Sequence, residues 1–137
     1  LNIPNIIYFY FYFCKMNTLT ILINLGVALT LINVWTIRFN KATIYRGGNA
    51  SSMKEEFALY GLPGWFMHII GALKIILSIS LIMGIWMPEL NVYSYVSLSV
   101  LMIGAIAMHL KAKDPIIKSV PAFFILTLLL TLISKNL

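Results

Sequence analysis

Lys74 occupies an unusual position for a charged side chain. It lies near the middle of an apolar stretch, Pro63 to Met87, that contains no other formal charge. A bilayer core about 30 Å thick is crossed by about 20 helical residues, so this stretch is long enough to span a membrane. A charge at that depth costs about 2.5–3.5 kcal/mol on insertion scales and usually faces a bundle interior or a polar cavity. Lys74 is therefore the leading candidate for a functional residue.

Three interpretations of Lys74 remain open from the sequence. The side chain could extend along the helix toward water or stay neutral because it is buried. It could instead contact a ligand or substrate, or lie in a contact between copies of the chain. The apolar stretches place no acidic residue at its depth. Its partners would then be amides, hydroxyls, carbonyls, water, or a ligand that carries an acid or a carbonyl.

Helical spacing predicts what surrounds Lys74. Its own stripe contains small residues, which allow a neighbouring helix to approach closely and so turn the lysine inward. That stripe comprises Met67, Gly71, Ser78 and Leu81. A matching stripe follows later in the chain, at Ser94, Ser97, Leu101, Gly104 and Met108. Asn24 and Asn33 can hydrogen-bond across helices. The candidate ligand-binding residues are Lys74, Gly71, Ser78, Asn33, Ser97 and His109.

His109 and Asp114 form a second polar group, with Lys111 and Lys113 between them. We favour an interfacial cap with basic anchors over a site here. The two histidines share no helix face with each other or with a cysteine, so no metal site is expected. The chain has no recognisable nucleophile with a base, phosphate loop or dinucleotide fingerprint. We therefore expect neither a catalytic residue nor an intrinsic cofactor.

Composition indicates the class of protein. The mean hydropathy is +0.92, and only 10% of residues are charged, whereas a soluble domain has about 25%. The net charge of +6 comes from basic residues spread over the ends of apolar segments, as is typical of membrane flanks rather than of a nucleic-acid-binding face. The expected partner is the lipid bilayer, and not nucleic acid.

Four apolar runs predict an all-α integral membrane protein. They are Leu19 to Ile37, Pro63 to Met87, Val92 to Leu110 and Ile116 to Ile133. Each must be a helix, because a bilayer offers no water to the backbone. Short links make neighbours antiparallel, which gives an up-and-down bundle of four transmembrane helices.

The ends of these helices are marked by specific residues. Pro88 breaks the second helix, and Asp114 with Pro115 supplies an N-cap and a first-turn proline for the fourth. Pro121 falls inside the fourth run, where we expect it to kink the helix.

Basic flanks predict an orientation. The first and third links carry seven lysines and arginines, and the opposite side carries only Lys15 and Lys135. The excess places those links in the cytoplasm and both termini outside, in a cell membrane such as the bacterial inner membrane.

The connection from Arg38 to Leu62 contains a predicted short amphipathic helix. Ser52 to Glu55 reads as a capping box, and Gly61 ends the turn. Met53, Phe57 and Tyr60 share one face, which we expect to lie under the headgroups and hold the connection against the mouth of the bundle. A lid over a substrate site is the less favoured reading.

Residues 1–15 form an aromatic N-terminal extension to the membrane domain at residues 16–137. Two hypotheses fit them. Translation could begin at Met16, so that the extension reflects a misassigned start, or the tyrosines could form an interfacial aromatic anchor.

Successive segments of the chain resemble the signatures of the DoxX-like family of small four-helix membrane proteins. They are FALYGLP at 57–63, IGALKII at 70–76, Leu81, GAIAMHL at 104–110 and KDP at 113–115. The resemblance extends from the first helix to the end of the chain. Many members have a glutamate where this chain has Lys74, so the chain resembles the lysine-bearing branch.

This resemblance implies two classes of function. The family is named for a subunit associated with a terminal quinol oxidase and a thiosulfate:quinone oxidoreductase. We therefore expect an accessory subunit of a quinone-linked membrane redox system, with a redox partner subunit and a quinone contact near Lys74. The alternative is a non-catalytic binder or transporter of a lipid or small hydrophobic molecule, or a membrane-protein chaperone. A homo-oligomer is compatible with both classes.

Overall fold

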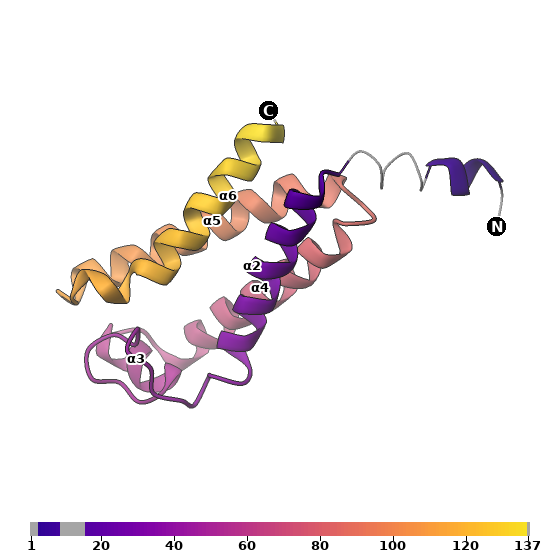
Figure 1. Ribbon diagram of the computed structural model, residues 1–137. Coiled ribbons are helices and arrows are strands. Elements are labelled where there is room, and N and C mark those ends of the chain that lie inside the picture. Colours follow the sequence, from indigo (N-terminus) through magenta and orange to yellow (C-terminus); the bar gives the residue numbers. More distant parts are fainter. Residues whose placement is uncertain (1–2, 9–15, 137) are drawn as a thin grey trace.

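The computed structural model describes residues 3–8 and 16–136, and these residues form helices and no strands. Residues 3–8 are helical and exposed, whereas the rest of the aromatic extension lies outside the described residues. The main elements are α2 (Thr18–Trp35), α3 (Met53–Leu59), α4 (Gly64–Met83), α5 (Glu89–Lys111), a 3-10 turn η1 (Ile116–Lys118) and α6 (Val120–Asn136) (Figure 1). The predicted all-α fold is confirmed.

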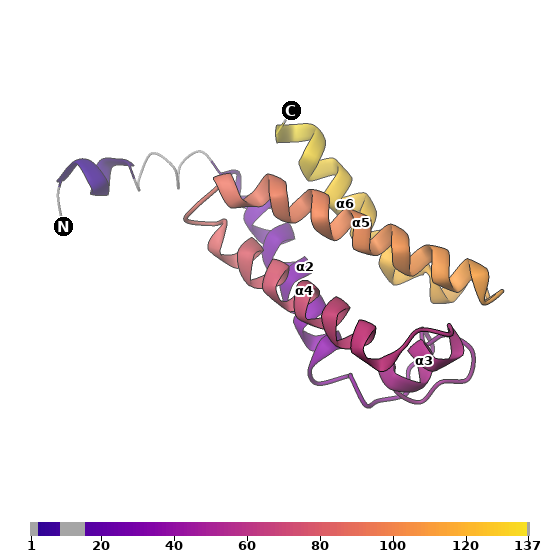
Figure 2. The same cartoon turned by 180° about the vertical axis from the view of Figure 1, so that it is seen from behind.

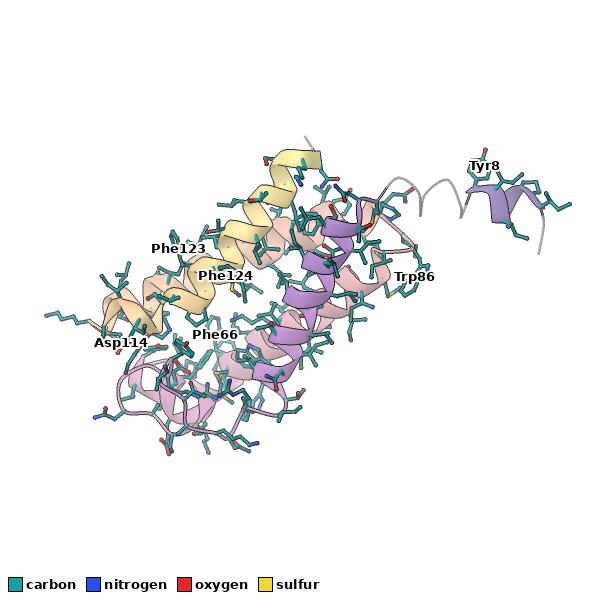
Figure 3. The ribbon with its side chains drawn as sticks, in the orientation of Figure 1. Tyr8, Phe66, Trp86, Asp114, Phe123 and Phe124 are labelled. Carbon is teal, nitrogen blue, oxygen red and sulfur yellow. The ribbon has the colours of Figure 1, made fainter. Side chains whose placement is uncertain are left out.

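Three helices, α2, α4 and α5, are long and apolar enough to cross a membrane. The fourth, α6, is apolar and has 17 residues, which is at the short end of the spanning range of about 17–25 residues. Large apolar side chains project from the outer faces of the helices; Phe123 and Phe124 of α6 are both 62% exposed (Figure 3). An outer surface of this kind suits lipid rather than water, and the chain is an integral membrane protein.

The helices form two pairs that converge at one end and diverge at the other. α2 packs on α4, α4 on α5, and α5 on α6, while α2 meets α6 over a shorter stretch. Figures 1 and 2 show the pair α2/α4 leaning away from the pair α5/α6 toward the end that carries α3. The connection between α2 and α4 lies at this diverging end, where the backbone amide of Gly48 donates to Asp114.

Apolar side chains fill the contact between the two pairs. Tyr95, Leu98, Leu81 and Leu129 are completely buried there. Because they come from α4, α5 and α6 and pack with Val27 of α2, one core joins all four long helices.

An amide network ties three helices together at the converging end. The Asn24 amide of α2 donates to Asn91 Oδ1 of α5 at 3.0 Å and to the Leu81 carbonyl of α4 at 3.3 Å. Tyr95 donates its hydroxyl to Asn24 Oδ1 at 2.8 Å, and Asn91 donates to the Gly84 carbonyl at 3.0 Å. The prediction that Asn24 hydrogen-bonds across helices is confirmed.

Gly84 is required by this network. A Cβ atom there would lie 1.9 Å from Asn91 Oδ1. The missing side chain therefore allows α5 to fold back against the end of α4.

The predicted start of the fourth helix is wrong in two respects. Asp114 does not act as an N-cap; its carboxylate bonds to His109 and Gly48 instead. Pro121 does not kink a helix, because α6 begins at Val120 after the separate turn η1. Pro121 thus lies in the first turn, where a helix needs no amide donor.

The prediction of a short capped helix within the first connection is confirmed. Ser52 is the N-cap of α3 and its side chain accepts from the Glu55 amide at 3.3 Å. Glu55 reaches back to Ser51 rather than to Ser52. Gly61 follows with φ of 73°, a left-handed conformation that glycine adopts without strain.

Candidate functional site

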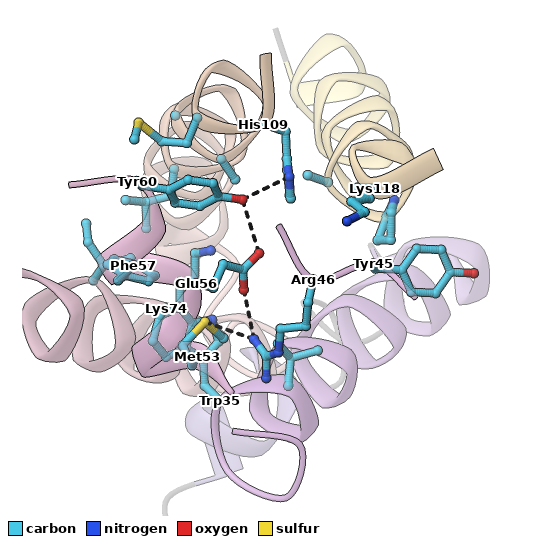
Figure 4. Close-up of a pocket in the computed structure, with 18 of the residues that line it drawn as sticks. Trp35, Tyr45, Arg46, Met53, Glu56, Phe57, Tyr60, Lys74, His109 and Lys118 are labelled. Atoms are coloured by element: carbon cyan, nitrogen blue, oxygen red, sulfur yellow. Dashed lines mark hydrogen bonds and ion pairs between the residues drawn. The ribbon is translucent and has the colours of Figure 1, made fainter. Parts of the chain in front are cut away.

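A cavity of about 580 Å³ lies between the two helix pairs at the diverging end. Its volume is within the range of about 300–1,000 Å³ that is usual for small-molecule sites. The wall is mostly apolar and includes Val34, Ile70, Leu101, Ala105 and Met108. Polar side chains also line it, among them Arg46, Glu56, Tyr60, Lys74, His109 and Lys118 (Figure 4).

Lys74 extends from α4 into this cavity. The residue is 9% exposed, and its amine makes no hydrogen bond or ion pair within the described residues. Every fully buried side-chain nitrogen or oxygen in that part of the chain has a partner. The Lys74 amine is therefore not sealed into the protein interior but reaches the space of the cavity, where it can donate to a ligand.

Trp35 of α2 forms the apolar side of the lysine site. Lys74 Nζ lies 5.2 Å from the centroid of the Trp35 ring, in cation–π range. Gly71 makes room for that ring, because a Cβ atom at this position would lie 2.6 Å from Trp35 Cε3. One face of the amine is thus covered by an aromatic ring.

The predicted inward stripe of the second helix is confirmed. Its buried residues are Met67, Gly71, Lys74, Ser78 and Leu81. The Ser78 hydroxyl donates to the Lys74 carbonyl at 2.6 Å. Ser78 therefore uses its only donor within α4 and packs below the cavity rather than lining it.

The other sequence candidates lie apart from the cavity lining. Asn33 is half-buried and is not in the wall. Ser97 is exposed, so its predicted place on the packed face of the third helix was wrong. α5 is rotated so that Asn91, Ser94, Leu98 and Met102 face inward. Of the six candidates, the structure brings only Lys74 and His109 together on the cavity.

Residues 46–60 of the connection between α2 and α4 cover the cavity at the diverging end, and we call them its roof. A buried ion pair lies within this roof. Arg46 donates to Glu56 Oε2 at 3.0 Å, with side-chain exposures of 6% and 9%. The same guanidinium donates to the carbonyls of Arg38, Phe39 and Lys41. A buried charge pair is stable only when its remaining hydrogen-bonding groups are also satisfied. Arg46 meets that condition through its hydrogen bonds to these three carbonyl groups of the connection.

Glu56 is equally well bonded. Its Oε1 accepts from the Gly47 amide at 2.8 Å and from the Tyr60 hydroxyl at 3.2 Å. Sequence reasoning missed this residue. A signal was available, because Glu56 is three residues after Met53 and four before Tyr60, which puts a carboxylate on the apolar face of α3.

That apolar face lines the cavity and does not lie under lipid headgroups. Met53 and Tyr60 are buried, and Met53 packs with Trp35 and Met67. The expectation that the connection is held against the mouth of the bundle is confirmed, whereas the expected headgroup contact of this stripe is wrong. The face is covered because α3 closes the gap left by the diverging helices.

His109 and Asp114 connect this roof to the other helix pair. Tyr60 Oη lies 2.9 Å from His109 Nδ1, and Asp114 Oδ2 lies 2.8 Å from the same nitrogen. Asp114 Oδ1 accepts from the Gly48 amide at 2.8 Å, and Lys118 donates to the Gly48 carbonyl. The interpretation of His109 and Asp114 as a plain interfacial cap is therefore incomplete, since they also hold the roof.

These bonds assign roles to the two ring nitrogens of His109. The Asp114 carboxylate can only accept, so Nδ1 carries the proton that it accepts, while Tyr60 donates its own proton to Glu56. Nε2 makes no bond within the described residues. Since His109 lines the cavity and no fully buried nitrogen lacks a partner, Nε2 is open to the cavity.

The environment fixes the charge states at the roof. Burial, together with the nearby Glu56 carboxylate, raises the pKa of Tyr60 far above its ordinary value. The hydroxyl is a neutral donor at any physiological pH. Burial alone would raise the pKa of Asp114, but hydrogen bonds from His109 and Gly48 outweigh it and lower the pKa. Asp114 is therefore a carboxylate at neutral pH.

In residues 3–8 and 16–136, no three histidine, cysteine, aspartate or glutamate side chains gather to hold a metal ion. The arrangement offers instead an amine, an imidazole nitrogen and a large apolar wall. Such a site can bind an apolar molecule through a carbonyl or an anionic group.

Comparison with known proteins agrees with this architecture. A family model described as the DoxX-like family matches residues 39–133, which include α3, α4, α5 and most of α6. Neither the curated proteins nor the solved structures provided a match to the chain. The family match covers well over half of the sequence, and we conclude that the chain belongs to the DoxX-like family.

Proposed function

We propose that the protein is an accessory subunit of a quinone-linked membrane redox system and binds the quinone headgroup in the cavity at Lys74. The observation that carries this proposal is the Lys74 amine, which makes no hydrogen bond or ion pair within the described residues and faces a mostly apolar cavity of about 580 Å³. A quinone headgroup is an apolar ring with carbonyl acceptors, which matches an apolar wall into which the Lys74 amine projects.

His109 supplies a second polar contact for such a ring. Its Nε2 is open to the cavity, while Asp114 holds Nδ1. A carboxylate on the far nitrogen fixes the orientation of an imidazole and leaves Nε2 of the neutral ring as an acceptor, which suits a hydroxyl of the reduced, quinol form of the ligand. Lys74 and His109 would thus contact polar atoms of one ligand from α4 and α5, respectively. The electron-transferring group would belong to the partner subunit.

A second candidate function follows from the same wall. Because the lining is mostly apolar, the cavity would also suit a lipid or another small hydrophobic molecule that carries an anionic group. The protein would then bind or move that molecule without a redox partner. A chaperone role for another membrane protein would need no ligand in the cavity.

Purification in mild detergent tests these proposals. The protein and the variants Lys74→Met and Lys54→Met are extracted with organic solvent, and the recovered molecules are identified by mass spectrometry. Lys54 is exposed and provides the matched control. We expect quinone with the wild type and with Lys54→Met, and its loss with Lys74→Met. A lysine-dependent lipid in place of quinone would support the second candidate, and retention by Lys74→Met would contradict both ligand proposals.

We also infer that the roof faces the cytoplasm. The basic first and third links lie together at the diverging end of the bundle, which suits the excess of positive charge on cytoplasmic loops. A reporter inserted near Asn49 should then behave as cytoplasmic and one fused after Leu137 as external. The reverse pattern would overturn this orientation.

A further inference from the structure

A groove on the lipid-facing side of the bundle lies between α2 and α6. Its volume is about 360 Å³, and its apolar lining includes Leu22, Val27, Phe124 and Ile125. Leu22 and Phe124 lie at its edges and are 60% and 62% exposed, respectively. Val27 and Ile125 form its floor and are buried. The groove is therefore open to the bilayer along its length.

Among the residues that the structure describes, the lining of the groove offers no free polar side chain. Thr30 is the one hydroxyl in its lining, and this hydroxyl donates to the Gly26 carbonyl at 2.7 Å. Gly26 adds open space, since no atom lies within 4 Å of a Cβ built there. The occupant of such a surface must be apolar, because a polar headgroup would leave its own hydrogen bonds unmade.

The groove adjoins the lysine cavity at one residue. Pro121 lines both spaces, and its neighbours divide between them: Ala122 lines the cavity, while Phe124 and Ile125 line the groove. α2 and α6, which flank the groove, touch over a shorter stretch than the other neighbouring long helices. A molecule could thus hold its polar end in the cavity and its apolar end in the groove.

We propose that the groove between α2 and α6 binds the apolar tail of the molecule whose headgroup lies at Lys74. The ligand is a tailed membrane quinone that reaches the cavity sideways from the bilayer, past Pro121. This inference rests on the proposed function and adds the substrate class and the route of access. The headgroup is selected by the donors of the cavity and the tail by the length of the groove.

The test compares two benzoquinones, one with a decyl tail and one with a methyl group in its place. Trp35 reports binding, because it lines the cavity beside Lys74 and quinones quench indole fluorescence. The protein has three tryptophans, so Trp65→Phe and Trp86→Phe leave Trp35 as the single reporter. Titrations use this protein in lipid nanodiscs. For each quinone, the affinity of a variant is divided by that of the parent protein. The partitioning of that quinone into lipid is the same in both titrations and therefore cancels from the ratio.

Gly26→Phe fills the groove, and Leu29→Phe is the matched control on an exposed face of α2 that does not line it. Displacing two or more tail methylenes from the groove weakens binding about tenfold. We expect that loss for the decyl quinone with Gly26→Phe, a change below about twofold for the methyl quinone, and no effect of Leu29→Phe. Thermal unfolding of both variants checks that the bundle is intact.

Three results would overturn the tail site. If Gly26→Phe leaves both affinities unchanged, the groove holds bulk lipid, and the headgroup site stands. If Gly26→Phe weakens the binding of both quinones equally, the substitution disturbs the bundle as a whole and does not act on the tail. Absence of quenching by either quinone in the parent protein would remove the proposed function together with the tail site.

Discussion

The two ends of the bundle contain polar clusters of opposite character. At the converging end, Asn24 and Tyr95 are completely buried, and their side-chain polar groups are used within the protein. At the diverging end, the Lys74 amine and His109 Nε2 face a cavity and make no bond within the described chain. One cluster fastens helices together, whereas the other leaves an amine and an imidazole nitrogen available to a ligand.

Whether a buried polar group has its hydrogen-bond partners within the protein distinguishes structural polar residues from candidate ligand-binding residues in this membrane protein. A buried polar group that finds all its partners stabilises helix contacts by about 0.6 kcal/mol on average. A polar group left without partners costs free energy. Such a cost is tolerated where function requires it, and Lys74 is the residue that bears it here.

The largest effect on stability is expected from the roof. Glu56→Gln removes the negative charge that Arg46 faces at 3.0 Å. Breaking a buried pair on one side typically costs 3–5 kcal/mol; Arg46 keeps its carbonyl partners, so we expect about 3 kcal/mol. Unfolding in detergent by increasing denaturant measures the change.

Glu55→Gln is the matched control for Glu56→Gln. Glu55 is the adjacent residue of α3; it is exposed, and within the described residues its carboxylate bonds only to Ser51. Its substitution should have much the smaller effect. Equal losses in the two variants would show that the buried pair has no special role.

A smaller loss is expected from the converging end. Asn24→Leu leaves Asn91 Oδ1 and the Tyr95 hydroxyl without their partner on α2. Hydrogen bonds between membrane helices are worth about 0.6 kcal/mol on average and about 1.7 at most, so the two together predict a loss of about 1–3 kcal/mol. Asn33→Leu is the control on the same helix, since Asn33 makes no side-chain hydrogen bond within the described residues.

Ligand binding distinguishes Asn24→Leu from a cavity variant. Quinone quenching of Trp35 should keep its affinity in this variant, because the amide network lies outside the cavity lining. An Asn24→Leu protein that is stable but no longer binds would contradict the division of the bundle into two separate clusters.

The smallest effect concerns acid. The folded protein lowers the pKa of Asp114 from its ordinary value of 3.8. A lowered carboxyl pKa adds stability that is fully present above about pH 4 and is lost as the pH falls through the folded pKa. Asp114→Asn should therefore be less stable at neutral pH but lose less on acidification. Parallel unfolding curves of the two proteins between pH 6 and about pH 3 would refute this role.

The sequence was sufficient to predict the long helices and the burial of Lys74. Apolar runs of spanning length specify helices, and the small residues Gly71 and Ser78 mark the face that turns inward. The capped helix α3 was also predictable, because Ser52 and Gly61 act through neighbouring backbone atoms. These features depend on residues that are close along the chain.

The roof could not be predicted in the same way. Its bonds join Tyr60 to His109 and Gly48 to Asp114, across links whose path is not set by any periodic pattern. Asp114 satisfies the local rule for an N-cap, but tertiary contacts with His109 and Gly48 take both of its oxygens. The cavity itself depends on the angle between two helix pairs, which the runs of apolar residues do not encode.

The central claim is that Lys74 binds a quinone headgroup in the cavity, and a fluorescence titration of Lys74→Met in the Trp35 reporter protein tests it most directly. Methionine keeps the length and apolar bulk of the side chain, so the bundle should be as stable or gain up to about 2.5–3.5 kcal/mol. Binding of the methyl quinone, which lacks the tail, should disappear. Lys74→Arg should also fail to bind, because Trp35 leaves little room for a planar fork. A Lys74→Met protein that is folded and binds the methyl quinone as tightly as its parent would contradict the claim.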